Sequence, residues 1–284
     1  MNAPTTAPTR GFNVLLEGPT GTGKTFSLRT LIEAGVTPFC IFTEPGYEVL
    51  EDIPADKCHW KYIPPASVGW DSLLESAQKI NQMTYDSLSK LGGVNKQHYK
   101  QFMEVITNLH NFTCDRTGEE FGDVSTWGPD RAIVIDGLSG LSQMAMDLVV
   151  GSKPTKAMPD WMMAQDNLQR LLDKLSNDTN CHFILIAHIE PEKDEVTGGT
   201  QLMASTLGRK LAPKLPRNFS DVVLARREES KFYWSTTNAR ADLKARNLPL
   251  SDTIEPSFKL MHEKWSARRA AGTVQPQAEG GTAT

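Results

Sequence analysis

A glycine-rich segment between an apolar run and a helical stretch constrains the fold of this chain more than any other feature. It reads Gly18-Pro19-Thr20-Gly21-Thr22-Gly23-Lys24-Thr25, follows the apolar residues 14–16 and precedes residues 26–34, which have helical character. Glycines let the backbone curl so that N–H groups point inward at phosphate oxygens, and the start of the helix adds a positive dipole end. The segment therefore predicts a phosphate-binding P-loop.

Two side chains at the end of this loop have distinct predicted roles. Lys24 would reach the β- and γ-phosphates of a nucleoside triphosphate, and Thr25 would hold Mg²⁺. The predicted nucleotide-binding residues are Gly18, Pro19, Thr20, Gly21, Thr22, Gly23, Lys24, Thr25 and Phe26. The alternative is a Gly/Thr-rich turn that matches by chance, but the eight-position pattern between strand and helix argues against it. We expect the chain to bind ATP or GTP.

Composition sets limits on the rest of the chain. Its 284 residues, 39% hydrophobic and 23% charged, are enough for one α/β domain with its own core. The net charge of −4 provides no global attraction to nucleic acid, so such a contact would need a local basic patch. No apolar stretch reaches the ~18 to 20 residues of a membrane span, and no signal peptide is visible. We expect a cytoplasmic protein without membrane contact.

The cysteines are scattered rather than paired in sequence. Cys40, Cys58, Cys114 and Cys181 form no CxxC motif, which is typical of reduced thiols in a cytoplasmic protein. A zinc site is the alternative, built from Cys58-His59 together with His110 and Cys114. Neither pair has the spacing of a zinc knuckle.

Short apolar strands alternate with helical patterns along most of the chain. The strands are predicted at residues 13–17, 39–43, 60–63, 132–135 and 183–187. Near-continuous apolar strands separated by helices indicate an α/β fold with a parallel sheet covered on both faces. Further strands at 221–225, 231–236 and 257–261, with no long helix between them, would extend the sheet antiparallel at one edge.

The remaining segments complete a single domain over residues 11–271. Residues 161–175 carry a helical apolar stripe that indicates core packing. Helices at 70–91 and 95–110 and a polar loop at 115–130 form an insertion of about 70–130. Residues 1–10 and 272–284 are rich in small and polar residues, so we expect disordered tails.

A second acidic position completes the predicted nucleotide site. Residues 132–135 form a buried strand that ends at Asp136, the Walker B candidate, which would position Mg²⁺ through its water shell. The alternative is that Asp136 caps the following helix, residues 138–150.

Hydrolysis also needs a group that orients or deprotonates the attacking water. AAA+ ATPases usually place a glutamate directly after the Walker B aspartate, where this chain has Gly137. Glu44 ends the strand that follows the P-loop helix, so it would lie beside the γ-phosphate at the carboxyl edge of the sheet. Glu44 would then be the catalytic acid, unless Glu44-Pro45-Gly46 is only a polar turn.

With these residues in place, residues 12–262 resemble the RecA-like ATPase class, whose members carry a catalytic glutamate at this strand end. The resemblance implies that His188, which ends the strand 183–187, senses the γ-phosphate and passes its state to a mobile loop. A neutral imidazole can donate one hydrogen bond to a phosphate oxygen. A satisfied core histidine is the alternative.

The resemblance also implies a DNA-contacting loop after His188. Residues 190–205 form a long polar stretch with Thr197-Gly198-Gly199-Thr200 in it, and the basic residues Arg209, Lys210, Lys214 and Arg217 follow. These four cations are the predicted DNA-binding patch. A solvated charged face is the alternative.

A third matching element is Lys244-Ala245-Arg246-Asn247, which is similar to the Lys-x-Arg element of replicative hexameric helicases. The resemblance implies that Lys244 and Arg246 act in trans on the γ-phosphate bound to a neighbouring copy, so the protein would be active as an oligomer. A surface basic pair is the alternative.

Within the class, the chain looks most like phage-associated RecA-like ATPases of the single-strand annealing and recombination kind. That implies ATP and Mg²⁺ as cofactors, and single-stranded DNA, further copies of the chain and a replication or recombination protein as partners. We expect no counterpart of RecA's N-terminal polymerisation helix or C-terminal domain, which would argue against filament formation, and Gly137 replaces a frequent serine. Two other hypotheses stay open: a regulatory or assembly ATPase with a protein partner and no DNA binding, and a P-loop module that binds nucleotide without turnover.

Overall fold

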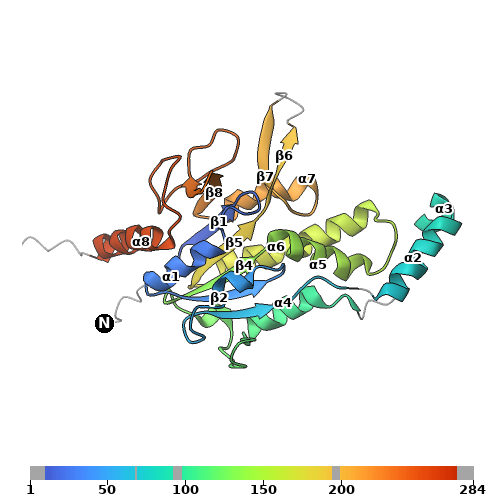
Figure 1. Cartoon of the computed structure of the whole chain (residues 1–284), viewed down its shortest axis with the longest axis horizontal. Coiled ribbons are helices and arrows are strands. Elements are labelled where there is room, and N and C mark those ends of the chain that lie inside the picture. The colour runs from blue at the N-terminus through green and yellow to red at the C-terminus, as the bar shows by residue number, and fades with distance from the viewer. Residues whose placement is uncertain (1–9, 68, 92–97, 194–198, 274–284) are drawn as a thin grey trace, which may run out of the picture.

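The computed structural model describes residues 10–67, 69–91, 98–193 and 199–273 (Figure 1). One sheet contains seven strands in the order β3-β2-β4-β5-β1-β8-β9. Their bounds are β1 (Asn13–Glu17), β2 (Thr37–Phe42), β3 (His59–Tyr62), β4 (Arg131–Asp136), β5 (His182–Ala187), β8 (Asp221–Glu228) and β9 (Lys231–Ser235). Neighbours pair in parallel except β8 and β9, which are antiparallel. The predicted α/β fold with a mostly parallel sheet and an antiparallel edge is confirmed.

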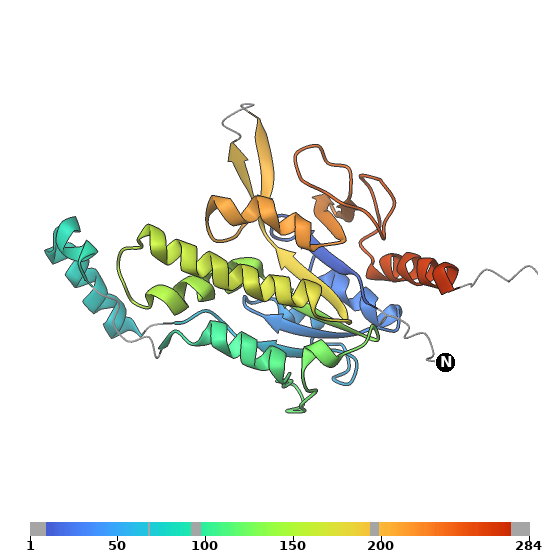
Figure 2. The same ribbon diagram turned by 180° about the vertical axis from the view of Figure 1, so that it is seen from behind.

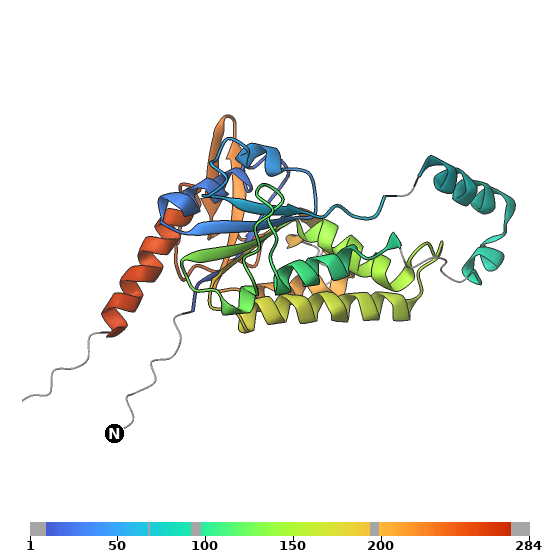
Figure 3. The same cartoon turned by 90° about the horizontal axis from the view of Figure 1, so that it is seen from below.

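Successive residues of a strand point to opposite faces of the sheet, so the strand side chains pack alternately into two apolar cores. Leu15, Ile133 and Leu185 pack with α4 (Gln101–His110), α5 (Leu138–Val150) and α6 (Met158–Asn177). Val14 and Ile184 pack with α1 (Arg29–Glu33) and α8 (Phe258–Thr273) on the other face. Figure 3 shows the sheet between these two helical layers.

The predicted apolar stripe of residues 161–175 belongs to α6. Leu168, Leu171, Leu172 and Leu175 are buried beneath this helix, each to 9% exposure or less. Burying a leucine side chain contributes roughly 1.5–3 kcal/mol, so this face anchors α6 firmly on the sheet. The interpretation of the stripe as core packing is confirmed.

The strand predicted at residues 257–261 is wrong, because these residues begin α8. Phe258, Met261 and Trp265 recur at helical spacing and pack into the core on the α1 side. The Phe258 N–H donates to Thr30 Oγ1 at 2.8 Å, which joins the start of α8 to α1. Five residues are too few to distinguish the two-residue period of a strand from the 3.6-residue period of a helix.

The insertion between β3 and β4 has two unlike parts. α4 packs on the body through Phe102, Val105 and Leu109, whereas α2 (Trp70–Gln82) and α3 (Tyr85–Ser89) contain no buried residue. These two helices extend away from the body in every view (Figure 1, Figure 2). The single helix predicted at 70–91 is thus two helices, and the one predicted at 95–110 starts at Gln101 after residues 92–97, which lie outside the described residues. A short turn, η4 (Val124–Thr126), precedes β4.

The long loop predicted at residues 190–205 is largely a hairpin instead. β6 (Ile189–Lys193) and β7 (Thr200–Ala204) form a separate antiparallel pair. The Ser205 N–H donates to the His188 carbonyl at 2.7 Å, which brings the two ends together. Residues 194–198 at the tip, including Thr197 and Gly198, lie outside the described residues. α7 (Gly208–Leu211) and η5 (Ala212–Asn218) follow the hairpin.

The chain ends and the domain division stay largely predictions. Residues 1–9 and 274–284 lie outside the described residues. The carbonyl of Arg10 accepts hydrogen bonds from Trp265 Nε1 at 3.2 Å and Arg269 Nη1 at 2.9 Å, so Arg10 is placed against α8. Within the part of the chain that the structure describes, no helix is both long and apolar enough to cross a membrane.

Candidate nucleotide-binding site

The P-loop follows the carboxyl end of β1, an inner strand that lies between β5 and β8. Gly21 and Gly23 have φ angles of +74° and +76°, a left-handed conformation that favours glycine. Gly18 lies so close to β8 that a Cβ there would be 2.5 Å from the Ala225 carbonyl oxygen. The 3-10 turn η1 (Phe26–Leu28) and α1 then continue the chain, with the Ser27 N–H donating to the Gly23 carbonyl at 3.0 Å. The predicted order of strand, loop and helical segment is present.

Lys24 is held inside the loop. Its side chain is buried at 6% exposure, and Nζ donates to the carbonyls of Gly18 at 2.8 Å and Pro19 at 2.7 Å. Burial lowers the pKa of the ammonium to about 8, against the opposing charges of Asp136 and Glu44. The group therefore keeps its charge at neutral pH and faces the same site as both carboxylates.

Thr25 and Asp136 meet as predicted for a magnesium site. The Thr25 hydroxyl donates to Asp136 Oδ2 at 2.6 Å. Burial raises the pKa of Asp136 to about 6, whereas the Thr25 hydrogen bond and Lys24 oppose that shift. Oxygen ligands suit Mg²⁺, so Thr25 would hold the ion and Asp136 would contact its water shell. A bound Mg²⁺ supplies positive charge to the phosphate oxygens.

Glu44 lies on the same edge, two residues after β2. Its Oε1 accepts the Gly140 N–H at 2.7 Å, and its Oε2 lies 3.3 Å from His188 Nε2. The hydrogen bond from His188 lowers the pKa of Glu44 to about 2, with the Gly140 N–H acting in the same direction and burial against it. A carboxylate this acidic is a weak proton acceptor at neutral pH. Its geometry suits an oriented acceptor for water better than proton abstraction.

His188 connects three parts of the site. Its Nε2 faces Glu44, and its Nδ1 lies 3.5 Å from the Thr20 hydroxyl in the P-loop. The hairpin strand β6 begins at the next residue, Ile189. The imidazole is therefore placed to couple the loop that holds phosphates to the hairpin.

The protein-family comparison adds an independent finding. Residues 10–248 match a family model described as an AAA domain. The chain belongs to this AAA domain family. No curated protein matches it.

Three solved structures have weak similarity to this AAA-family chain. A type III secretion system ATPase of pathogenic bacteria has a TM-score of 0.37 at 11% identity, over 77% of this chain and 53% of that one. The RadB recombinase has a TM-score of 0.33 at 12% identity, over 82% and 84%. The flagellar accessory protein FlaH from Methanocaldococcus jannaschii has a TM-score of 0.32 at 9% identity, over 83% and 81%. The chain thus spans about half the length of the secretion ATPase.

Hydrogen bonds between the Thr43 side chain, after β2, and the Gly137 backbone, after β4, support the site and were not predicted. The Thr43 hydroxyl donates to the Gly137 carbonyl at 2.5 Å and accepts the Gly137 N–H at 3.1 Å. A Cβ at Gly137 would lie 2.9 Å from Glu44 Oε2, which gives a physical reason for glycine after the Walker B aspartate. No sequence signal marks these contacts, because they exist only once two strands are neighbours.

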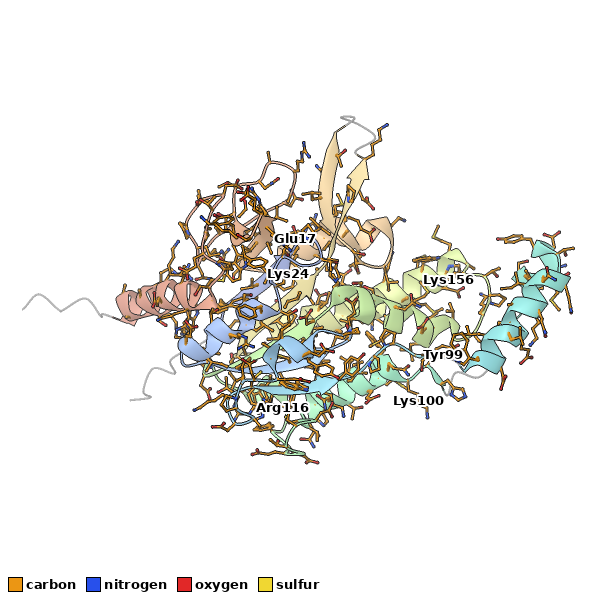
Figure 4. The ribbon with its side chains drawn as sticks, in the orientation of Figure 1. Glu17, Lys24, Tyr99, Lys100, Arg116 and Lys156 are labelled. Atoms are coloured by element: carbon orange, nitrogen blue, oxygen red, sulfur yellow. The ribbon has the colours of Figure 1, made fainter. Side chains whose placement is uncertain are left out.

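Glu17 is a second feature that the sequence did not reveal. It ends β1 directly before the P-loop, with 3% exposure (Figure 4). Burial raises the pKa of its carboxyl to about 8, and the charge of Asp242 adds to the shift. Glu17 is therefore largely protonated at neutral pH, so it adds little negative charge behind the phosphate site.

Replacing Glu17 by Gln is expected to flatten the pH dependence of stability and to stabilise the protein at pH 8. The native carboxyl keeps its proton up to a pKa of about 8, whereas an unfolded one releases it near 4.5. Between these values the native state binds more protons, so stability falls as pH rises, by at most about 1.4 kcal/mol per pH unit. Urea unfolding at several pH values measures this. Asp242→Asn should flatten the curve less, and equal curves for Glu17→Gln and the native protein would contradict the expectation.

Lys244 and Arg246 lie near the amino ends of the parallel strands, whereas the P-loop lies at their carboxyl ends. Lys244 pairs with Val222 near the amino end of β8, and β8 runs parallel to β1. Lys244 Nζ donates to the carbonyls of Pro216 at 2.6 Å and Phe219 at 3.3 Å. The structure therefore does not bring this pair to the P-loop of its own chain.

A basic groove surrounds this pair. Its volume is about 350 Å³, and its lining includes the cations Arg10, Arg217, Lys244, Arg246 and Arg268. Arg217 thus belongs to this groove, while Lys210 and Lys214 are exposed on α7 and η5 and Arg209 lies in α7. The predicted DNA patch is divided between two places.

The zinc alternative finds no support among the described residues, where no group of three or more candidate ligands gathers. The four cysteines are buried free thiols. His110 has an 81% exposed side chain and faces Asp123 at 3.1 Å.

Proposed function

We propose that this AAA-family chain hydrolyses ATP with Mg²⁺ and acts on single-stranded DNA in annealing, recombination or repair. The setting would be phage DNA metabolism in the host cytoplasm, with a replication or recombination protein as a further partner. The family match and the P-loop are the observations that support nucleotide binding. The DNA role depends on the RecA-like resemblance and on the arrangement around His188.

The position of His188 is the observation that carries the proposal. It touches the P-loop through Thr20 and the catalytic candidate through Glu44, and it directly precedes the β6–β7 hairpin. Loss of a γ-phosphate would change the charge beside Thr20 and Glu44. A shift of the imidazole would then move the base of the hairpin, since the Ser205 N–H is bonded to the His188 carbonyl.

The elements after His188 supply the proposed DNA face. The hairpin is followed by α7 and η5, which carry Lys210 and Lys214 on the surface. Each lysine can neutralise one backbone phosphate and release a counterion. Single-stranded DNA bound along this face would then be bound more or less tightly as the hairpin moves with the nucleotide state.

Trans catalysis is the second part of the proposal. Lys244 and Arg246 are exposed near the amino ends of the parallel strands, and the P-loop lies at the carboxyl ends. A head-to-tail assembly would set the basic groove of one copy against the nucleotide of the next. The further cations of the groove, Arg10, Arg217 and Arg268, favour a polyphosphate ligand there.

Single-stranded DNA is expected to stimulate ATP hydrolysis, and the stimulation should weaken as salt increases. Lys210→Ala with Lys214→Ala removes two phosphate contacts, so the slope of log K against log salt should fall by about 1.4. ATPase rates and oligonucleotide binding at two salt concentrations measure both effects. Lys79→Ala with Lys90→Ala, on the α2–α3 arm, is the matched control. DNA that neither binds nor stimulates would exclude the DNA role.

A nucleotide-switched ATPase with a protein partner is the second candidate. The α2–α3 arm favours it, since its exposed apolar side chains include Trp70 at 87% and Tyr85 at 73% exposure. Exposed apolar patches are typical of protein–protein contact sites. Nucleotide-dependent binding of a protein, with no DNA binding, would support this candidate.

A further inference from the structure

Two exposed aromatic rings stand beside the P-loop. Phe232 on β9 is 42% exposed and Phe26, directly after Thr25, is 59% exposed. A Cβ on Gly23 would lie 3.3 to 3.7 Å from three atoms of the Phe232 ring, so this ring rests against the loop. The Ser27 N–H bond to Gly23 shows that Phe26 lies within one turn of the same glycine. Both rings are thus near one end of the phosphate cradle.

The strand order indicates which end of a nucleotide would reach these rings. Asp136, Glu44 and His188 follow β4, β2 and β5, which all lie on one side of β1. The reacting γ-phosphate must face that side. Phe232 is on β9, the second strand on the other side of β1, roughly 10 Å away at the usual strand spacing. A triphosphate in the loop therefore directs its nucleoside toward β8 and β9.

The Phe232 ring is held in place. Arg227 lies opposite it in the β8–β9 pair, with the guanidinium carbon 5.9 Å from the ring centroid. Arg227 Nε donates to the Glu229 carbonyl at 2.8 Å, which fixes the guanidinium. A ring supported on one side and exposed on another is a stacking surface for a planar base.

We propose that Phe232, with Phe26 near the same end of the loop, binds the base of the nucleotide by stacking. This site deepens the proposed ATPase function and rests on nucleotide binding at the P-loop, not on DNA. Stacking tolerates any base with a π-face, so the rings add affinity for ATP and GTP with little choice between them.

The test compares ATP with inorganic triphosphate, both with Mg²⁺, on the full chain by calorimetry without DNA. Phe232→Ala should weaken ATP binding by about 5- to 150-fold, the range of base stacking, and leave triphosphate binding within about twofold. Phe26→Ala should act in the same direction, and Phe232→Tyr should retain ATP affinity. Tyr85→Ala, an exposed ring on the arm, is the matched control.

Each other outcome would overturn the proposal. Equal weakening of both ligands by Phe232→Ala would mean that the ring only supports the loop. Unchanged ATP binding would place the base elsewhere. Lys24→Ala should weaken both ligands, and if it does not, the P-loop function itself fails, which separates that failure from a failure of the stacking site.

Discussion

Glu44→Gln is expected to lower kcat for ATP hydrolysis by on the order of 10²-fold, the cost of a poorly positioned reacting group, with ATP affinity nearly unchanged. The amide keeps the volume of the side chain but loses the charge that the His188 bond and the Gly140 N–H stabilise. An amide orients water less effectively than a carboxylate, and it cannot accept the same hydrogen bond from His188 on a charged oxygen. ATPase rates together with direct ATP binding separate turnover from affinity.

The matched variant for Glu44 is Glu48→Gln, which changes a nearby carboxylate in η2 (Tyr47–Leu50). It should leave kcat unchanged. The low pKa of Glu44, about 2, adds that the charged form persists across the pH range of an ordinary assay. No fall in rate between pH 8 and pH 5 should therefore come from Glu44. Full activity of Glu44→Gln would remove this residue from the mechanism.

Arg246→Ala is expected to lower ATPase activity by about 10³- to 10⁵-fold, the range of a cation supplied to the γ-phosphate. Arg246 lies near the amino ends of the strands, remote from its own P-loop. In the proposed assembly it would therefore act on the nucleotide of a neighbouring copy. Arg170→Ala, an exposed arginine of α6, is the control and should keep its activity.

Mixing two inactive proteins distinguishes trans from cis action. Lys24→Ala protein keeps Arg246, and Arg246→Ala protein keeps its P-loop, so about a quarter of the interfaces in a random head-to-tail assembly are intact. Activity should reappear on mixing and follow the mixing ratio. Its complete absence would indicate that each chain hydrolyses ATP without its neighbour, and that Lys244 and Arg246 have another role.

Local patterns were sufficient for the P-loop, for Asp136 and for the parallel core strands. Gly21 and Gly23 need a left-handed backbone, which few other residues adopt. Strands such as β4 and β5 are buried on both faces, so their sequences are apolar throughout. Both properties belong to single residues or short segments, which is why they can be read without the fold. Glu44 was predicted to lie at the carboxyl ends of the strands, and the structure places it there beside Gly140 and His188; its catalytic role stays a prediction.

Contacts between distant segments needed the tertiary structure. The bond from the Gly140 N–H to Glu44 spans 96 positions, and that between Thr20 and His188 spans 168. Glu17 is acidic by sequence and largely neutral in the fold, because burial beside Asp242 alters its proton affinity. Residues 257–261 became a helix because Phe258 and Met261 fit the core beside α1. The amino-acid types determined the local backbone conformation and which segments are apolar. The tertiary structure determined which carboxyl groups keep their proton, which side chains are hydrogen-bonded, and at which end of the strands each cation lies.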